Sequence, residues 1–200
     1  MRARRLAFVL AAFVLAMAAA AEAQELSLSV GAGGLFPKEG KYREIYGSGL
    51  SFGGDVWFKL KGRLGFAAGF GSVSDTGTAL QDGFGTAVYP LSFRRTSAPV
   101  IAFYQLDAGP VVVRFGAGAG FHSYKETWTT VAQDGVNLHY DGRKISPRFV
   151  MTASLALISR ISLFCSASYD TIRAGAGSAL ATTVDIGGLQ LLGGLAFRIF

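Results

Sequence analysis

Apolar residues recur at every second position in several stretches of the chain. Between residues 50 and 60 the even positions are almost all apolar, whereas the odd positions are Ser51, Gly53, Asp55, Trp57 and Lys59. This period of two predicts a β-strand with one apolar face and one polar or small face. The pattern restarts at Leu64, directly after Lys61-Gly62, which predicts a hairpin with a tight turn.

The same alternation predicts eight strands. They are expected at residues 25–36, 50–60, 64–71, 100–106, 111–122, 148–158, 161–170 and 184–200. Three tight turns, at Lys61-Gly62, 107–110 and Ser159-Arg160, alternate with four longer polar stretches, at 37–47, 73–98, 125–146 and 171–183. This alternation predicts an eight-stranded antiparallel up-and-down β-barrel, with the tight turns at one rim and the long loops at the other.

Two segments do not fit this pattern cleanly. Residues 86–97 contain Pro90 and Arg94-Arg95, and they fit either a loop or an extension of the fourth strand. In the last strand the apolar parity changes between Ile186 and Leu189, and a bulge at Gly187-Gly188 would reconcile the two halves.

Charge decides which face of the predicted barrel meets lipid. Only 16% of the residues are charged, whereas a soluble domain has about 25%. An exposed charge in the bilayer is costly, so the few charges within the strands should all point inward. We expect them to pair in a polar network that fills the lumen: Asp55, Lys59, Arg114, Asp170, Asp185 and Arg198.

The first 23 residues have the layout of a secretory signal peptide. Arg2, Arg4 and Arg5 precede an apolar run, and Ala21-Glu22-Ala23 forms an A-x-A cleavage site. We therefore expect export and removal of residues 1–23, leaving residues 24–200 as one barrel domain. The removal changes the net charge from +6 to +4, and the remaining basic residues are too dispersed to indicate nucleic-acid binding.

The layout resembles the eight-stranded outer-membrane β-barrel families of Gram-negative bacteria, such as the OmpA barrel domain and the OmpX-like and OmpW-like barrels. The most specific feature is the terminal segment 192–200, with Phe197 and the final Phe200. The resemblance implies an outer-membrane location, contact with outer-membrane lipids, recognition of the last strand by the barrel-assembly machinery, and a monomer. One departure is that Phe200 shares parity with Arg198, whereas the last aromatic usually shares a face with the preceding apolar residues.

The sequence offers little chemistry for an enzyme. The G-x-S-x-G, H-E-x-x-H, P-loop and EF-hand patterns are absent, Cys165 is the single cysteine, and no cofactor or metal site is expected. His122-Ser123 invites comparison with the outer-membrane lipid A deacylases, but adjacent strand residues face opposite sides and cannot readily act as base and nucleophile. His139, beside Asp141, is expected to be solvated in a loop, and Gly116, Gly118 and Gly120 to line the lumen.

The loops hold two further groups of candidate residues. The first group is aromatic and is expected to anchor the barrel at the membrane interface or, as an alternative, to contact a partner: Tyr42, Tyr46, Phe84, Tyr89, Tyr124 and Trp128. The second group is basic and is positioned for lipid phosphates, although acidic neighbours dilute it: Lys38, Lys41, Arg43, Arg94, Arg95, Lys125, Arg143 and Lys144.

These features favour a non-enzymatic outer-membrane barrel with a filled lumen, which supports the envelope or presents surface loops. A narrow, porin-like channel for small or hydrophobic solutes is the first alternative. A secreted, soluble lipocalin-like barrel is the second, although its early G-x-W motif is not found.

Overall fold

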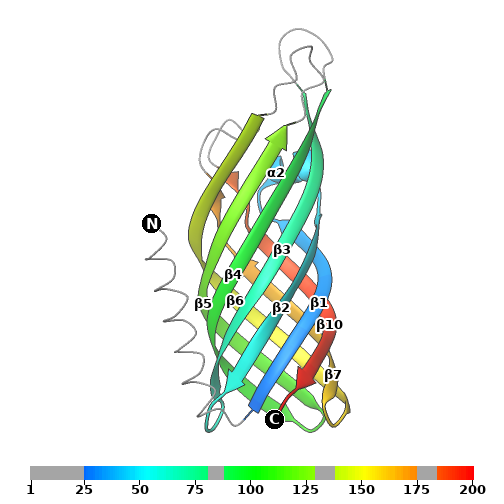
Figure 1. Cartoon of the computed structure of the whole chain (residues 1–200), viewed down its shortest axis with the longest axis vertical. Helices are drawn as coiled ribbons and strands as arrows, with labels where there is room; N and C mark the ends of the chain where they lie inside the picture. The colour runs from blue at the N-terminus through cyan, green and yellow to red at the C-terminus, as the bar shows by residue number, and fades with distance from the viewer. Residues whose placement is uncertain (1–24, 81–87, 129–137, 175–183) are drawn as a thin grey trace.

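The chain forms a closed antiparallel barrel of eight strands in the computed structural model, which describes residues 25–80, 88–128, 138–174 and 184–200 (Figure 1). The barrel strands are β1 (Glu25–Pro37), β2 (Gly49–Lys59), β3 (Leu64–Leu80), β4 (Val88–Ala108), β5 (Val111–Trp128), β6 (Leu138–Ile158), β7 (Ile161–Asp170) and β10 (Gly188–Arg198). Each strand pairs with its neighbour along the chain, and β10 pairs with β1 to close the barrel. The predicted up-and-down architecture is confirmed.

The apolar face of each strand points outward. In β2, Leu50 and Phe52 are 67% and 46% exposed, whereas Ser51 between them is fully buried. In β6, Met151 lies on the outside and Thr152 on the inside. An apolar exterior and a polar interior reverse the arrangement of a soluble barrel and fit a bilayer, so the lipocalin-like alternative is wrong.

Four strands are much longer than the other four. Strands β3 to β6 have 17 to 21 residues, whereas β1, β2, β7 and β10 have 10 to 13. Figure 1 shows the long strands rising above the rest of the barrel, opposite the tight turns. The prediction of loops over 73–98 and 125–146 is therefore wrong for most of their length, because alternation continues there with polar side chains outside the membrane. Residues 88–97 belong to β4, which resolves the alternative left open for that segment.

The mouth of the barrel holds a short helix and a small hairpin. The helix α2 (Gly40–Tyr46) lies between β1 and β2, and β8 (Arg173–Ala174) pairs with β9 (Val184–Asp185) outside the barrel ladder. Within the described residues, no helix has the length and apolarity needed to cross a membrane.

The last strand is interrupted, and the predicted bulge is wrong. Val184 and Asp185 belong to the small hairpin, while β10 begins only at Gly188. Gly188 has φ +154°, and a Cβ atom there would lie 2.3 Å from the carbonyl oxygen of Phe36. Glycine at this position lets the chain leave the hairpin and join β1 at close range, so the change in parity marks the junction of two elements.

The two terminal aromatics occupy different positions. Phe197 lies on the outer face of β10 with Leu195, as the parity predicts. Phe200 follows the end of β10 at Arg198, and its backbone oxygen accepts a hydrogen bond from the Leu26 amide. The parity mismatch of Phe200 therefore falls outside the strand.

We expect a charged substitution on the outer face to lower stability only where that face is apolar. Met151→Arg places a cation in the middle of the apolar belt and should lower the free energy of unfolding by about 2–4 kcal/mol. Ser123→Arg, on the outer face beyond the belt, should change it by about 0–1 kcal/mol. Urea unfolding in lipid vesicles, followed by the mobility shift between unboiled and boiled samples, measures both. Equal effects of the two substitutions would contradict the assigned lipid-facing surface.

Candidate functional site in the barrel interior

Charged and aromatic side chains fill the lumen near the tight-turn rim. The Arg114 guanidinium donates to Gln105 Oε1 at 2.8 Å and to Glu25 Oε1 at 3.2 Å. It also lies over the Trp57 ring, 5.2 Å from the centroid, and Phe103 packs edge-on against the same tryptophan. Ion pairing and cation–π contact together satisfy a buried guanidinium that would otherwise be costly.

A second polar layer lies further along the barrel and centres on Arg148. Its Nη1 atom donates to Asp170 Oδ2 at 2.9 Å, and its Nη2 atom donates to Ser168 Oγ at 2.8 Å and Gln190 Oε1 at 3.1 Å. Gln190 also donates to Ser51 of β2, on the other side of β1. This layer ties strands β6, β7, β10 and β2 across the lumen.

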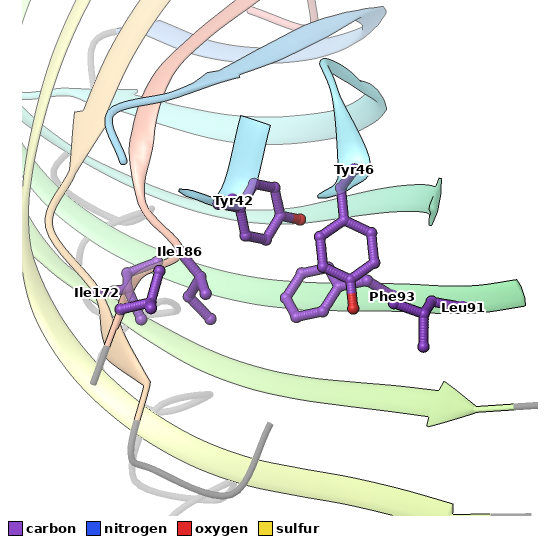
Figure 2. Close-up of a cluster of buried hydrophobic side chains, with 7 residues drawn as sticks. Tyr42, Tyr46, Leu91, Phe93, Ile172 and Ile186 are labelled. Atoms are coloured by element: carbon purple, nitrogen blue, oxygen red, sulfur yellow. The ribbon is translucent and has the colours of Figure 1, made fainter. Parts of the chain in front are cut away.

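The mouth is closed by an aromatic and aliphatic cluster. Figure 2 shows Tyr42 and Tyr46 of α2 facing Phe93 of β4 and Ile172 and Ile186 near the hairpin. These side chains are buried, and Leu91 and Val184 complete the cluster. The helix therefore packs into the mouth of the barrel like a stopper.

A polar pair anchors this stopper to the barrel wall. Tyr42 Oη donates to Asp75 Oδ2 of β3 at 2.5 Å, and Arg95 of β4 donates to the Ile186 carbonyl oxygen at 2.9 Å. Helix α2 lies outside the membrane-spanning strands, and there burial, followed by the charge of Asp75, raises the pKa of Tyr42 far above its ordinary value. The phenol therefore stays protonated and remains the donor.

The six residues expected to form one network lie in separate places. Arg114 and Arg198 both approach Glu25, and Lys59 pairs with Asp107 at 3.2 Å. Asp170 belongs to the Arg148 layer. Asp55 forms no ion pair within 4 Å among the described residues, and its side chain covers Gly69.

Asp185 has a different role from the one expected of a lumen residue. Its Oδ1 atom accepts hydrogen bonds from the backbone amides of Ile172 and Gly187, at 2.7 and 2.9 Å. It thereby holds the hairpin closed at the barrel mouth. The predicted six residues do not pair with one another; their partners are other side chains and backbone groups.

The sequence contained a signal for most of the partners that the prediction missed. Arg148 and Gln190 each stand opposite an apolar face within a predicted strand, and so point inward by parity alone. Glu25 begins the first strand, in register with Lys59. Arg95 carries no such signal, because the sequence of its segment fits either a loop or a strand.

His122 points inward and Ser123 outward, as the sequence predicts. The partner of His122 is instead Ser146, with Nε2 and Oγ 2.9 Å apart. The nearest carboxylate, Asp170, lies 3.9 Å from the same Nε2, and Nδ1 has no partner among the described residues. A catalytic relay needs the acid on the other ring nitrogen from the nucleophile, so these three side chains do not form one.

The remaining predicted residues fall into three groups. The interface-anchor prediction is wrong for Tyr42 and Tyr46, which are buried in the mouth, while Tyr124 is partly buried against them. Phe84 and the side chains of Tyr89, Trp128 and His139 lie outside the described residues. The glycines of 116–120 lie in β5, and a Cβ at Gly116 would meet Ile101 inside the barrel, so they belong to a strand and not to a phosphate-binding loop.

A metal site is not formed by the described part of the chain. Within those residues, no three His, Cys, Asp or Glu side chains are grouped closely enough to hold an ion.

Comparison with solved structures identifies the fold. OprG of Pseudomonas aeruginosa aligns with a TM-score of 0.61 at 10% identity, over 89% of this chain and 97% of that protein. Ail of Yersinia pestis, solved with the heparin analogue sucrose octasulfate, gives 0.60 at 13% identity, over 88% and 98%. A major outer membrane protein of Thermus thermophilus gives 0.59 at 16%, over 88% and 98%. No family model and no curated protein sequence matches the chain.

The chain has the fold of the eight-stranded outer-membrane β-barrels. Its apolar exterior and polar, side-chain-filled interior agree with this fold. At these identities the likeness extends to the architecture alone and does not show a specific role.

The Arg148–Asp170 pair allows a test of the middle layer. Arg148→Met leaves Asp170 buried without its cation and should lower the free energy of unfolding by about 3–5 kcal/mol. The double variant Arg148→Met/Asp170→Asn removes both charges and should recover most of that loss. Urea unfolding in micelles is measured for wild type, the two single variants and the double variant. Additive effects on the free energy of unfolding would show that the two charges do not interact.

The Tyr42–Asp75 contact predicts a dependence on alkaline pH. A folded-state pKa raised above the unfolded value makes the stabilising effect complete below about pH 10, and it is lost as the pH rises further. We expect the free energy of unfolding to fall by up to about 1.4 kcal/mol per pH unit above pH 10. Tyr42→Phe should reduce this slope, and Tyr169→Phe, on the barrel exterior, should not. An unchanged slope in Tyr42→Phe would contradict the burial of this phenol.

Proposed function

We propose that the protein is a sealed, non-enzymatic outer-membrane barrel that supports the envelope and holds a tall wall of strands at the cell surface. The observation that carries this proposal is the filling of the lumen at three levels, by the Arg114 group, the Arg148 group and the α2 cluster. A solute would have to displace either ion pairs or packed aromatics at every level. Sealing the barrel is therefore favoured over conduction.

The wall formed by β3 to β6 supports the surface part of the proposal. Paired strands extend past the apolar belt, and their outer faces are exposed and polar at residues such as Arg94, Lys125 and Arg143. A paired sheet presents side chains more rigidly than a loop does. Ail, the attachment invasion locus protein of Yersinia pestis, has this fold, and its name supports a surface-contact role as part of the proposal.

Biogenesis and assembly complete the proposal. Residues 1–23 direct export and are removed, the barrel-assembly machinery recognises the last strand with Phe197 and Phe200, and the barrel acts as a monomer in contact with outer-membrane lipids. The chain needs no cofactor for this role.

Planar-bilayer recording tests whether the barrel is sealed. The purified barrel should give no stable single-channel steps in concentrated KCl, and Trp57→Ala/Arg114→Ala should remain closed because two further levels block the lumen. A general porin inserted in the same membranes is the positive control, and heat-unfolded protein controls for adventitious leakage. Stable steps from the wild-type barrel that are absent from the unfolded sample would replace this proposal with the channel alternative.

A further inference from the structure

A groove lies on the outer wall of the barrel where the apolar belt ends. It has a volume of about 600 Å³ and is lined by residues of β3 to β6. Ala98, Phe121 and Ile145 stand side by side in register on three adjacent strands, and Phe70 of β3 lies at the same groove. This part of the groove faces the hydrocarbon of the membrane.

In the apolar part of the groove, a small side chain forms the floor and larger side chains form the two sides. Ala98 contributes only a methyl group, whereas the flanking Phe70 and Phe121 are 54% and 39% exposed. Large exposed side chains on either side of a small one leave a slot along the wall. An acyl chain lying in such a slot would contact protein on several sides and not only on one.

The next rows along the same strands are polar and then basic. Thr96, Ser123 and Arg143 follow the apolar row in register, and Arg94, Lys125 and Asp141 follow these. The cations exceed the single carboxylate, and within the described residues none of Arg94, Lys125 and Arg143 forms an ion pair. The outer face therefore changes from apolar to cationic between Ala98 and Arg94 on β4, and between Phe121 and Lys125 on β5.

We propose that this groove binds one phosphorylated lipid of the outer leaflet. The acyl chain lies over Ala98 between Phe70 and Phe121, and the phosphate meets Arg143 and Lys125 above the belt. Charge complementarity selects an anionic headgroup, because each cation near a lipid phosphate contributes favourably. The apolar row selects a lipid over a free anion, since a soluble phosphate would leave that part of the slot empty. The site is independent of whether the lumen is sealed.

Native mass spectrometry of the barrel in maltoside micelles tests the site, with diphosphorylated lipid A as the probe. Wild type should retain one copy, and removal of the lipid's phosphates should weaken binding about tenfold. Arg143→Gln/Lys125→Gln should weaken binding by a similar factor. The matched control is Lys41→Gln/Arg43→Gln, which removes two cations from α2 at the same end of the barrel and should bind like wild type.

A second pair of variants tests the apolar part of the groove. Ala98→Trp fills the slot while leaving every charge in place, and it should weaken binding at least about fivefold through lost acyl contacts. Ala102→Trp, on the same outer face of β4 but away from the groove, should bind like wild type. The mobility shift on boiling shows that each variant is folded.

Three results would overturn the proposal. Equal losses in the α2 control and the groove variant would show a general effect of charge. Unchanged binding in Ala98→Trp would show that no acyl chain lies in the slot. Displacement of the lipid by millimolar inorganic phosphate would show a site for a free anion instead of a lipid.

Discussion

Closure of the backbone ladder between β1 and β10 is the constraint on which the rest of the structure depends. Hydrocarbon offers no hydrogen-bond partners, so an unpaired strand edge inside the membrane would leave a row of costly amides and carbonyls. Pairing from Ser27 with Arg198 to Pro37 with Gly188 removes both edges at once. Eight strands then leave a lumen only wide enough for side chains, and the inward-facing residues must fill it.

The filling of this lumen follows from the cost of buried charge. Inward charges cannot be solvated by bulk water, so partners on other strands stabilise them. Arg114 reaches Glu25 and Gln105, and Arg148 reaches Asp170 and Gln190. The contacts with Glu25 and Gln190 link strands that are not neighbours in the ladder. The same contacts that satisfy the charges therefore also obstruct a passage.

The sequence predicted the parts of this structure that depend on local alternation. Strand number, tight turns, barrel topology and the inward direction of Asp55, Arg114 and Asp170 all follow from a period of two and from charge placement. Pairing across the lumen did not follow, because Glu25 and Gln190 are brought to Arg114 and Arg148 by register around a closed ring. The stopper was also missed: Tyr42 and Tyr46 stand four residues apart, a helical spacing, but the segment is short and polar enough to be taken for a loop.

The unequal height of the strands connects the mouth with the outer groove. Strands β3 to β6 rise past the belt, and a wall of four strands has an inner and an outer face. The inner face packs the stopper through Leu91 and Phe93, so that apolar surface beyond the membrane is buried. The outer face passes from apolar to basic where it leaves the membrane. Because successive side chains alternate between the two faces, Arg95 can hold the mouth closed while Arg94 remains available outside.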